Sequence, residues 1–192
     1  DHDDWALPAT FTISFFVYFT KLFQSDGAGL IGLYQDSTHY WYLAVSENSG
    51  QFYFTATNTS KIMHYDTYPA FTTGRFYHVE IAKEADGTGY IFIDGVKKNL
   101  YAGLIELSGA LPNFTAPLTI GYAEWGNGDF GGYISDFRIR KIVKHTESFT
   151  TPVEFGRAAV NGSAGSAGSV SWVNLPYTAF SSALFRGALV NG

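Results

Sequence analysis

The sequence predicts an all-β fold of the sandwich or barrel type, and three features carry this prediction. Aromatic residues make up 18% of the 192 residues, and most of them are Tyr and Phe, which are common in strands. The stretch YIFIDGVK, which begins at Tyr90, is an apolar run broken by Asp-Gly, a dipeptide typical of tight hairpin turns. Short apolar segments alternate with turn residues along the chain, a spacing typical of sandwiches and barrels.

The first predicted strand, Phe11–Phe19, has the clearest pattern. One face carries Phe11, Ile13, Phe15, Val17 and Phe19, and the other carries Thr12, Ser14, Phe16 and Tyr18. A period of two over nine residues indicates a strand, and we expect the first set to face the core. Further strands are predicted at Leu30–Tyr34, Tyr40–Ser46, Gln51–Thr57, Phe76–Lys83, Tyr90–Asp94, Leu118–Tyr122 and Tyr133–Ile142.

Composition excludes several classes of partner and site. The formal net charge is −5, which argues against nucleic acid, because phosphate binding needs a basic face. The chain has no Cys, so disulfide scaffolds and thiolate metal sites are excluded. No apolar run approaches the roughly 20 residues that span a bilayer, so we expect no membrane insertion. The chain starts at Asp1 and its one Met is Met63, so we expect a processed product or a part of something longer.

The composition changes after Phe155. Residues 156–169, GRAAVNGSAGSAGS, read as a flexible linker. Residues 170–192 regain apolar side chains but are too few for a core of their own. We therefore expect a sandwich over residues 1–155, the linker, and a flexible C-terminal arm over 170–192 that docks on neighbouring subunits, so that the protein is an oligomer.

Three segments in order resemble laminin-G-like domains of the concanavalin A-like lectin/glucanase superfamily. They are DDWALPATFTISFFVYF near the start, GRFYHVEIAKEADGTGYIFIDGVKK in the middle, and APLTIGY with FGGYISDFRIRKIVKHTESFTTP at the end. The closing run is most similar to versions in bacteriophage virion proteins, such as tail-fibre and decoration proteins, and in bacterial surface proteins. The resemblance covers residues 3–155 and implies a two-sheet antiparallel jelly roll with Asp94-Gly95 as the tight turn of its central meander.

The resemblance also implies a calcium site. It nominates Asp4 and Asp136, and Asp129 is a nearby loop carboxylate. Ser135 stands where the family often has a first Asp, which leaves Asp136 alone and weakens the inherited site.

Catalytic patterns are missing from the sequence. Glucan-hydrolysing members of the superfamily carry acidic residues at alternate positions of one strand. Here that spacing occurs only in Asp1/Asp3, at the chain end, and in Glu84/Asp86, in a predicted turn where solvated carboxylates are the simpler interpretation. There is no nucleophile elbow and no zinc spacing among the His residues, so we expect no enzyme.

Three aromatic clusters could bind glycan, since rings pack on the apolar faces of sugars while polar groups orient the hydroxyls. The first is Trp125 with Asn127 and Asp129; the second is Asp36 with Tyr40; the third contains Tyr65. Each has an ordinary alternative: Trp125 could pack over the sandwich edge, the second cluster could cover a sheet face, and the third could be a plain loop. Alternation puts Tyr40 and Tyr42 opposite Trp41, so one of these two sets belongs to the core.

These observations predict a non-catalytic module, carried on a virion or cell surface, that binds cell-surface glycan or decorates the assembly. The alternative is a purely structural module of the same assembly that makes protein–protein contacts without sugar. A secreted glycanase is the third possibility. All three imply an extracellular or virion-surface location.

Overall fold

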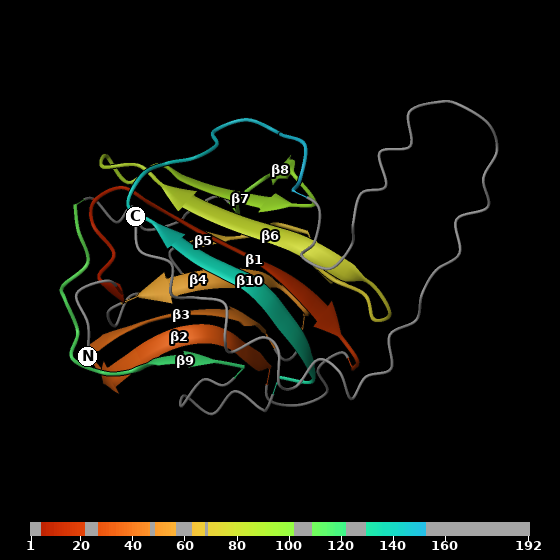
Figure 1. The fold of residues 1–192 in the computed structure, drawn as a ribbon, viewed down its shortest axis with the longest axis horizontal. Helices are drawn as coiled ribbons and strands as arrows, with labels where there is room; N and C mark the ends of the chain where they lie inside the picture. The colour runs from red at the N-terminus through yellow and green to blue at the C-terminus, as the bar shows by residue number, and fades with distance from the viewer. Residues whose placement is uncertain are drawn as a thin grey trace, which may run out of the picture. The chain divides into compact units, whose positions relative to one another are not determined.

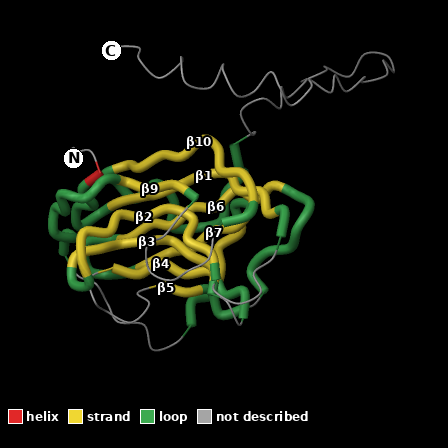
Figure 2. The backbone as a smooth tube through the Cα atoms, turned by 90° about the horizontal axis from the view of Figure 1, so that it is seen from below, coloured by secondary structure: helices red, strands yellow, loops and turns green. Residues whose placement is uncertain are grey.

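The structure is a computed structural model that describes residues 5–21, 27–46, 49–56, 63–67, 69–101, 109–121 and 130–152. Within these ranges the chain forms two five-stranded antiparallel sheets stacked as a sandwich (Figure 1). One sheet, here sheet A, has the order β10-β1-β6-β7-β8; the other, sheet B, has the order β5-β4-β3-β2-β9. From below, the strands of sheet B run side by side as one layer (Figure 2). The all-β, two-sheet antiparallel prediction is confirmed.

The strand bounds follow the predicted strands closely. They are β1 Phe11–Phe19, β2 Ala28–Asp36, β3 His39–Val45, β4 Phe52–Ala56, β5 Met63–His64, β6 Phe76–Lys83, β7 Gly89–Ile93, β8 Val96–Lys98, β9 Leu118–Ile120 and β10 Gly132–Arg140. Strands β5 and β8 were not predicted separately, because two or three residues are too few to display a period of two. The turn between β7 and β8 is as predicted, with φ values of 53° at Asp94 and 73° at Gly95.

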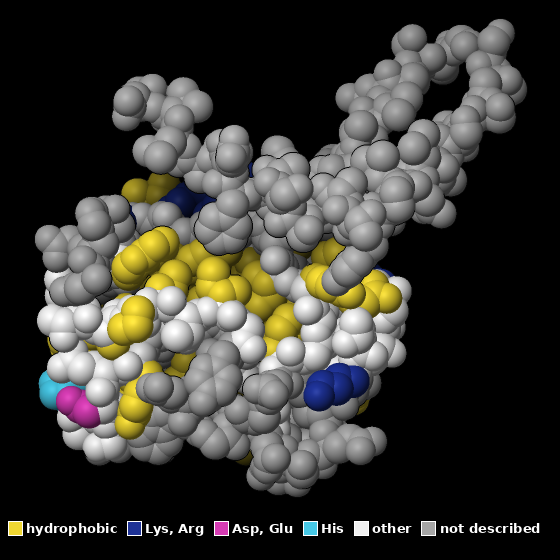
Figure 3. All heavy atoms as spheres, turned by 60° about the horizontal axis from the view of Figure 1, so that its bottom comes forward, with side chains coloured by type: hydrophobic (Ala, Val, Ile, Leu, Met, Phe, Trp, Pro, Cys, Tyr) yellow, Lys and Arg dark blue, Asp and Glu magenta, His cyan; other side chains and the backbone are white. Residues whose placement is uncertain are grey.

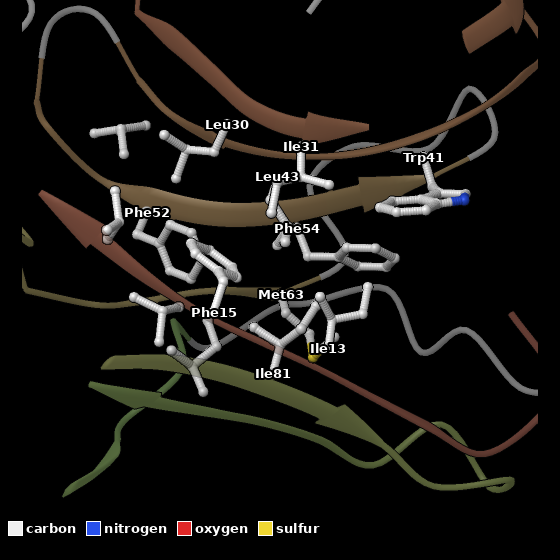
Figure 4. Close-up of a cluster of buried hydrophobic side chains, with 14 of the residues drawn as sticks. Ile13, Phe15, Leu30, Ile31, Trp41, Leu43, Phe52, Phe54, Met63 and Ile81 are labelled. Carbon is white, nitrogen blue, oxygen red and sulfur yellow. The ribbon is translucent and has the colours of Figure 1, made fainter. Parts of the chain in front are cut away.

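The core lies between the two sheets, as the alternation in β1 predicts (Figure 4). Phe11, Ile13, Phe15, Val17 and Phe19 are each at most 1% exposed. They meet the inward side chains of sheet B, and the Phe11 and Phe54 ring centroids lie 5.7 Å apart. Trp41 is 1% exposed and belongs to this core, which settles which face of β3 is internal.

A bulge in β10 keeps its apolar residues facing inward. Ser14 of β1 pairs with Arg138 and Phe16 pairs with Ser135, so one extra residue lies between them. Asp136 absorbs it with a φ of 51°, a conformation that Asp tolerates better than most side chains. The inward positions therefore step from Ile134 to Phe137, three residues apart.

The outer face of sheet A is covered by residues 141–152, here called the closing segment. The Thr12 hydroxyl donates to the Ile142 carbonyl at 2.7 Å, and the Lys144 amide donates to that hydroxyl at 2.9 Å. Further along, the Phe149 amide donates to the Gly95 carbonyl at 2.8 Å. This cover explains why Thr12, Ser14 and Phe16, on the outward side of β1, are at most 6% exposed.

Several predictions concern residues outside the described ranges. These are the linker 156–169, the arm 170–192 and the site residues Asp4, Trp125, Asn127 and Asp129, which stay predictions. In the part of the chain that is described, no helix has the length and apolar character needed to cross a membrane.

Candidate functional site

Four tyrosines lie together on the outer face of sheet B, and we call them the tyrosine surface: Tyr34 of β2, Tyr40 and Tyr42 of β3, and Tyr53 of β4. Strand alternation puts them there, because Leu33, Trp41 and Phe54 next to them point into the core. The register then aligns the strands, since Tyr34 pairs directly with Tyr40. Three strands therefore contribute to one aromatic surface.

The rings form a continuous row across the sheet. Centroids lie 6.3 Å apart from Tyr34 to Tyr40, 5.6 Å from Tyr40 to Tyr42, and 6.0 Å from Tyr42 to Tyr53. Tyr40 and Tyr53 are buried, whereas Tyr34 and Tyr42 are partly exposed. Hydrophobic side chains gather on this side of the molecule, and a histidine lies beside an acidic side chain at its margin (Figure 3).

The hydroxyl of Tyr42 lies in a low-dielectric environment. Burial, with the neighbouring Tyr53 and Tyr40 as smaller causes, raises the pKa of Tyr42 well above its usual value. A hydrogen bond with the Tyr53 side chain contributes to the same shift, so the Tyr42 hydroxyl is already engaged within the row.

Gly32 makes room for this row. It pairs with Tyr42 across the β2–β3 ladder, and a Cβ atom built on Gly32 would lie 2.6 Å from the Tyr42 Cβ. Even the smallest side chain would push Tyr42 away. Glycine is needed here because strands β2 and β3 approach closely at this position, and not because of its φ angle.

Asp36 and His39 end the row at the β2–β3 turn. The Asp36 Oδ1 accepts hydrogen bonds from the Thr38 amide and from the Thr38 hydroxyl, each at 2.8 Å. His39 Nδ1 lies 2.8 Å from the same oxygen. The Thr38 amide, followed by His39, lowers the pKa of Asp36 to about 2, so the carboxylate is ionised above that pH. The Asp36 carboxylate therefore stabilises the β2–β3 turn, which lies next to Tyr34 and Tyr40.

The predicted site residues that the structure describes do not all meet. Asp36 and Tyr40 lie at the same end of β2 and β3, as their cluster implied. Tyr65 instead follows β5, pairs with Leu100 and lines a separate cavity of about 240 Å³. That cavity shares no lining residue with the tyrosine surface.

The described residues offer no calcium site. No three His, Cys, Asp or Glu side chains gather within the described ranges in a way that could hold a metal. The Asp136 carboxylate is already engaged, with Arg138 Nη2 at 2.6 Å and Arg138 Nε at 2.8 Å. Because Asp4 and Asp129 lie outside these ranges, the calcium site stays a prediction.

Glu84 and Asp86, interpreted from the sequence as solvated turn carboxylates, accept hydrogen bonds at that turn. Asp86 Oδ1 accepts from the Thr88 amide at 2.9 Å inside its turn, and Glu84 Oε1 accepts from the Tyr90 hydroxyl at 2.6 Å. Glu80 of β6 was not singled out from the sequence. It is 0% exposed and lies 2.7 Å from His145 Nδ1 under the closing segment, so it cannot reach a polysaccharide.

Sequence reasoning missed Tyr34, Tyr42 and Tyr53 as site residues. The signal for Tyr42 was present in the motif YWY, which places Tyr40 and Tyr42 on one face. Tyr34 and Tyr53 join that face only through the pairing of β2 and β4 with β3, and register of this kind is not readable from one strand.

A protein-family model matches most of the sequence. The family model described as concanavalin A-like lectin/glucanases superfamily matches residues 1–147. This confirms the resemblance to laminin-G-like domains. No curated protein matches the chain.

Solved structures share the architecture. Domain 4 of an extracellular arabinanase from Geobacillus stearothermophilus, in complex with arabinotriose, aligns with a TM-score of 0.54 at 19% identity, over 71% of this chain and 62% of that one. The CBM40 domain of a Ruminococcus gnavus IT-sialidase, bound to α2,3-sialyllactose, aligns with a TM-score of 0.54 at 14% identity, over 72% and 79%. Domains LG4-5 of the mouse laminin α1 chain align with a TM-score of 0.52 at 14% identity, over 77% and 41%. At these identities the likeness is one of fold.

Proposed function

The chain belongs to the concanavalin A-like lectin/glucanases superfamily, and from this premise we propose that it is a non-catalytic glycan-binding module. The tyrosine surface is the observation that carries the proposal. Tyr34 and Tyr42 offer partly exposed rings, and the buried Tyr40 ring lies 6.3 Å from the first and 5.6 Å from the second, between centroids. The arabinanase domain and the CBM40 domain, which share the fold, are themselves sugar complexes, and this supports the same use here.

The physical basis is that of an apolar platform with a few polar groups. The hydroxyl-poor face of a sugar ring loses water when it packs on Tyr42, and the tyrosine hydroxyls orient the sugar by hydrogen bonds. The rings are held by the sheet and by each other, so little side-chain entropy is lost on binding.

Hydrolysis is not part of the proposal. Two carboxyl groups must flank a scissile bond with separations of about 5–10 Å in glycosidases. Among the described residues, Asp36 is the carboxylate next to the tyrosine surface, and its oxygens accept hydrogen bonds from Thr38 and His39. The described part of this surface therefore does not offer the pair of carboxyl groups that hydrolysis needs.

The proposal includes a setting. The module is displayed outside cells, on a cell surface or a virion, where it contacts cell-surface glycan, and the arm 170–192 joins it to neighbouring subunits. The extracellular arabinanase and the laminin chain with the same fold support an extracellular location.

Binding of the intact chain to a glycan array, followed by titration of the best ligand, tests the function. Tyr42→Ala should weaken that ligand about tenfold or more, because tenfold corresponds to about 1.4 kcal/mol, roughly what burial of ~55 Å² of apolar surface contributes. The matched control is Tyr133→Ala, which removes a 44%-exposed tyrosine from the other sheet and should leave affinity unchanged. An array without any bound glycan, or equal losses in both variants, would refute the proposal.

A further inference from the structure

A second concave site lies at the β7–β8 hairpin. It is the cavity of about 240 Å³ that Tyr65 lines, and its wall also contains Thr72, Arg75, Asp94, Val96 and Lys98. Its volume is slightly below the range of roughly 300–1,000 Å³ that is typical of ligand pockets, so it suits a single sugar unit. The proposed glycan surface on sheet B uses none of these residues.

Arg75 is held at this wall by two contacts. Its guanidinium carbon lies 3.8 Å from the centroid of the Tyr77 ring, and its Nη2 donates to Asp94 Oδ2 at 2.8 Å. The Tyr77 hydroxyl accepts a hydrogen bond from the Thr72 amide at 2.8 Å, which fastens the segment that carries Arg75.

Asp94 is held just as firmly. Its Oδ1 accepts from the His78 amide at 3.0 Å, and its own amide donates to the His78 carbonyl at 2.8 Å. Because a guanidinium has five N–H donors, and Asp94 and the Tyr77 side chain engage only some of them, others remain for a ligand.

Lys98 adds a second cation to the cavity wall, close to Tyr65. Its Nζ lies 5.7 Å from the centroid of the Tyr65 ring, and no carboxylate of the described residues lies within 4.0 Å of it. Arg75 and Lys98 against Asp94 give the cavity wall a formal charge of +1, on a chain whose formal net charge is −5. Local charge of this sign favours an anion.

The apolar part of the wall narrows the chemistry of that anion. Val96, which is 51% exposed, and Tyr65 both line the cavity, so the ligand meets apolar area as well as charge. A planar carboxylate can accept two parallel hydrogen bonds from the Arg75 guanidinium, and a sugar ring can pack on the face of the Tyr65 ring.

We infer that this cavity binds a carboxylate-bearing sugar, a uronic acid residue within a glycan. The ligand class rests on the proposed glycan-binding function, but the site is separate from the tyrosine surface. The carboxylate lies between the Arg75 and Lys98 side chains, and the pyranose ring packs on Tyr65.

The experiment compares trigalacturonate with its methyl ester, which keeps the sugar chain but carries no charge, by calorimetric titration of the intact chain. The acid should bind and the ester should bind about tenfold more weakly or not at all, since one charge-assisted hydrogen bond is worth about 1.5 kcal/mol. Lys98→Met should weaken the acid to a similar degree. Lys97→Met is the matched control, because the neighbouring Lys97 pairs with Glu147 at 3.2 Å and does not line the cavity.

Several outcomes would overturn the inference: no binding of the acid, equal affinity for the ester, or equal losses in the two lysine variants. Displacement of trigalacturonate by an equal concentration of inorganic phosphate would overturn its saccharide part. Tyr42→Ala separates the two sites. It should leave trigalacturonate binding intact even if it abolishes array binding, and Lys98→Met should do the reverse.

Discussion

Two histidine–carboxylate pairs of nearly equal length occupy opposite sides of the sandwich. On sheet A, His145 Nδ1 lies 2.7 Å from Glu80 Oε1, with side chains 23% and 0% exposed. On sheet B, His39 Nδ1 lies 2.8 Å from Asp36 Oδ1, with both side chains 48% exposed. Distance alone would rank them as equals. The two pairs differ in burial. Water screens the exposed pair of His39 and Asp36, so that pair adds little to stability, whereas Glu80 is removed from water and has His145 as its partner.

The surroundings of the two pairs also differ, and again the pair on sheet A is the more enclosed one. His145 stacks on Phe149 at 3.7 Å, and Phe149 also contacts Phe92 at 5.3 Å, so the buried pair is part of an apolar layer under the closing segment. Glu80 Oε2 has no hydrogen-bond partner among the described residues, which leaves the carboxylate dependent on His145. The Asp36 pair holds only its own turn. The closing segment therefore covers the outer face of sheet A around Glu80, whereas on sheet B Tyr34 and Tyr42 stay partly exposed.

The largest expected effect tests whether the outer face of sheet A is truly sealed. Phe16 points to that face, is 6% exposed and contacts the His78 ring at 5.0 Å. Phe16→Ala should lower the free energy of unfolding by about 3–5 kcal/mol, the usual range for a buried Phe. Tyr34→Ala, on the partly exposed face of sheet B, should cost about 1 kcal/mol, because less area is lost.

Urea denaturation measures both variants. If Phe16→Ala cost no more than Tyr34→Ala, the closing segment would not seal the face, and the contrast between the sheets would fail.

The next effect compares the two pairs directly. His145→Ala leaves the Glu80 carboxylate buried without its partner, which should cost about 2–4 kcal/mol at pH 7, somewhat less than for a fully buried pair because His145 is 23% exposed. His39→Ala should leave the free energy of unfolding nearly unchanged, because its pair is exposed.

A double variant distinguishes a lost hydrogen-bond partner from a lost aromatic contact. Glu80→Met combined with His145→Ala should recover part of the stability, because no polar side chain is left buried without a partner. Failure to recover any would assign the loss to the Phe149 stack instead of the contact with Glu80.

These pairs also illustrate what a sequence can predict. Alternation in β1 gave the inward face, and Asp94-Gly95 gave the hairpin, because both depend on neighbours within a few residues. Asp36 and His39 are three residues apart, so their proximity follows from one turn. Glu80 and His145 are 65 residues apart, and no local pattern connects them.

The candidate site follows the same division. Tyr40 was predicted because its cluster lies within one strand and its turn. Tyr34 and Tyr53 became part of the site through the register of three strands, and the cavity at Tyr65 formed through Arg75 and Lys98 from other elements. A site assembled from distant strands needs the pairing before it can be seen.

The smallest of the three effects concerns His78, the other histidine under the closing segment. It is 5% exposed, and its Nδ1 has no hydrogen-bond partner among the described residues. Burial, with Lys144 as the next cause, lowers the pKa of His78 from 6.5 to about 4, although Asp94 and Asp136 oppose the shift and His145 adds to it.

The sign of the pH dependence follows from proton binding. Between pH 6.5 and pH 4 the unfolded chain protonates this histidine and the folded chain does not, so stability is complete above pH 6.5 and falls as the pH is lowered through that window. One pKa unit corresponds to about 1.4 kcal/mol, so the loss attributable to His78 should approach about 2–3 kcal/mol at the lower end. Urea denaturation at pH 7 and pH 4.5 should therefore show a steeper loss for the native chain than for His78→Gln. Tyr34→Ala keeps His78 and is the control, so its loss of stability between pH 7 and pH 4.5 should equal that of the native chain. If His78→Gln also showed the native loss, the His78 ring would be in contact with water, and the closing segment would not cover the centre of sheet A.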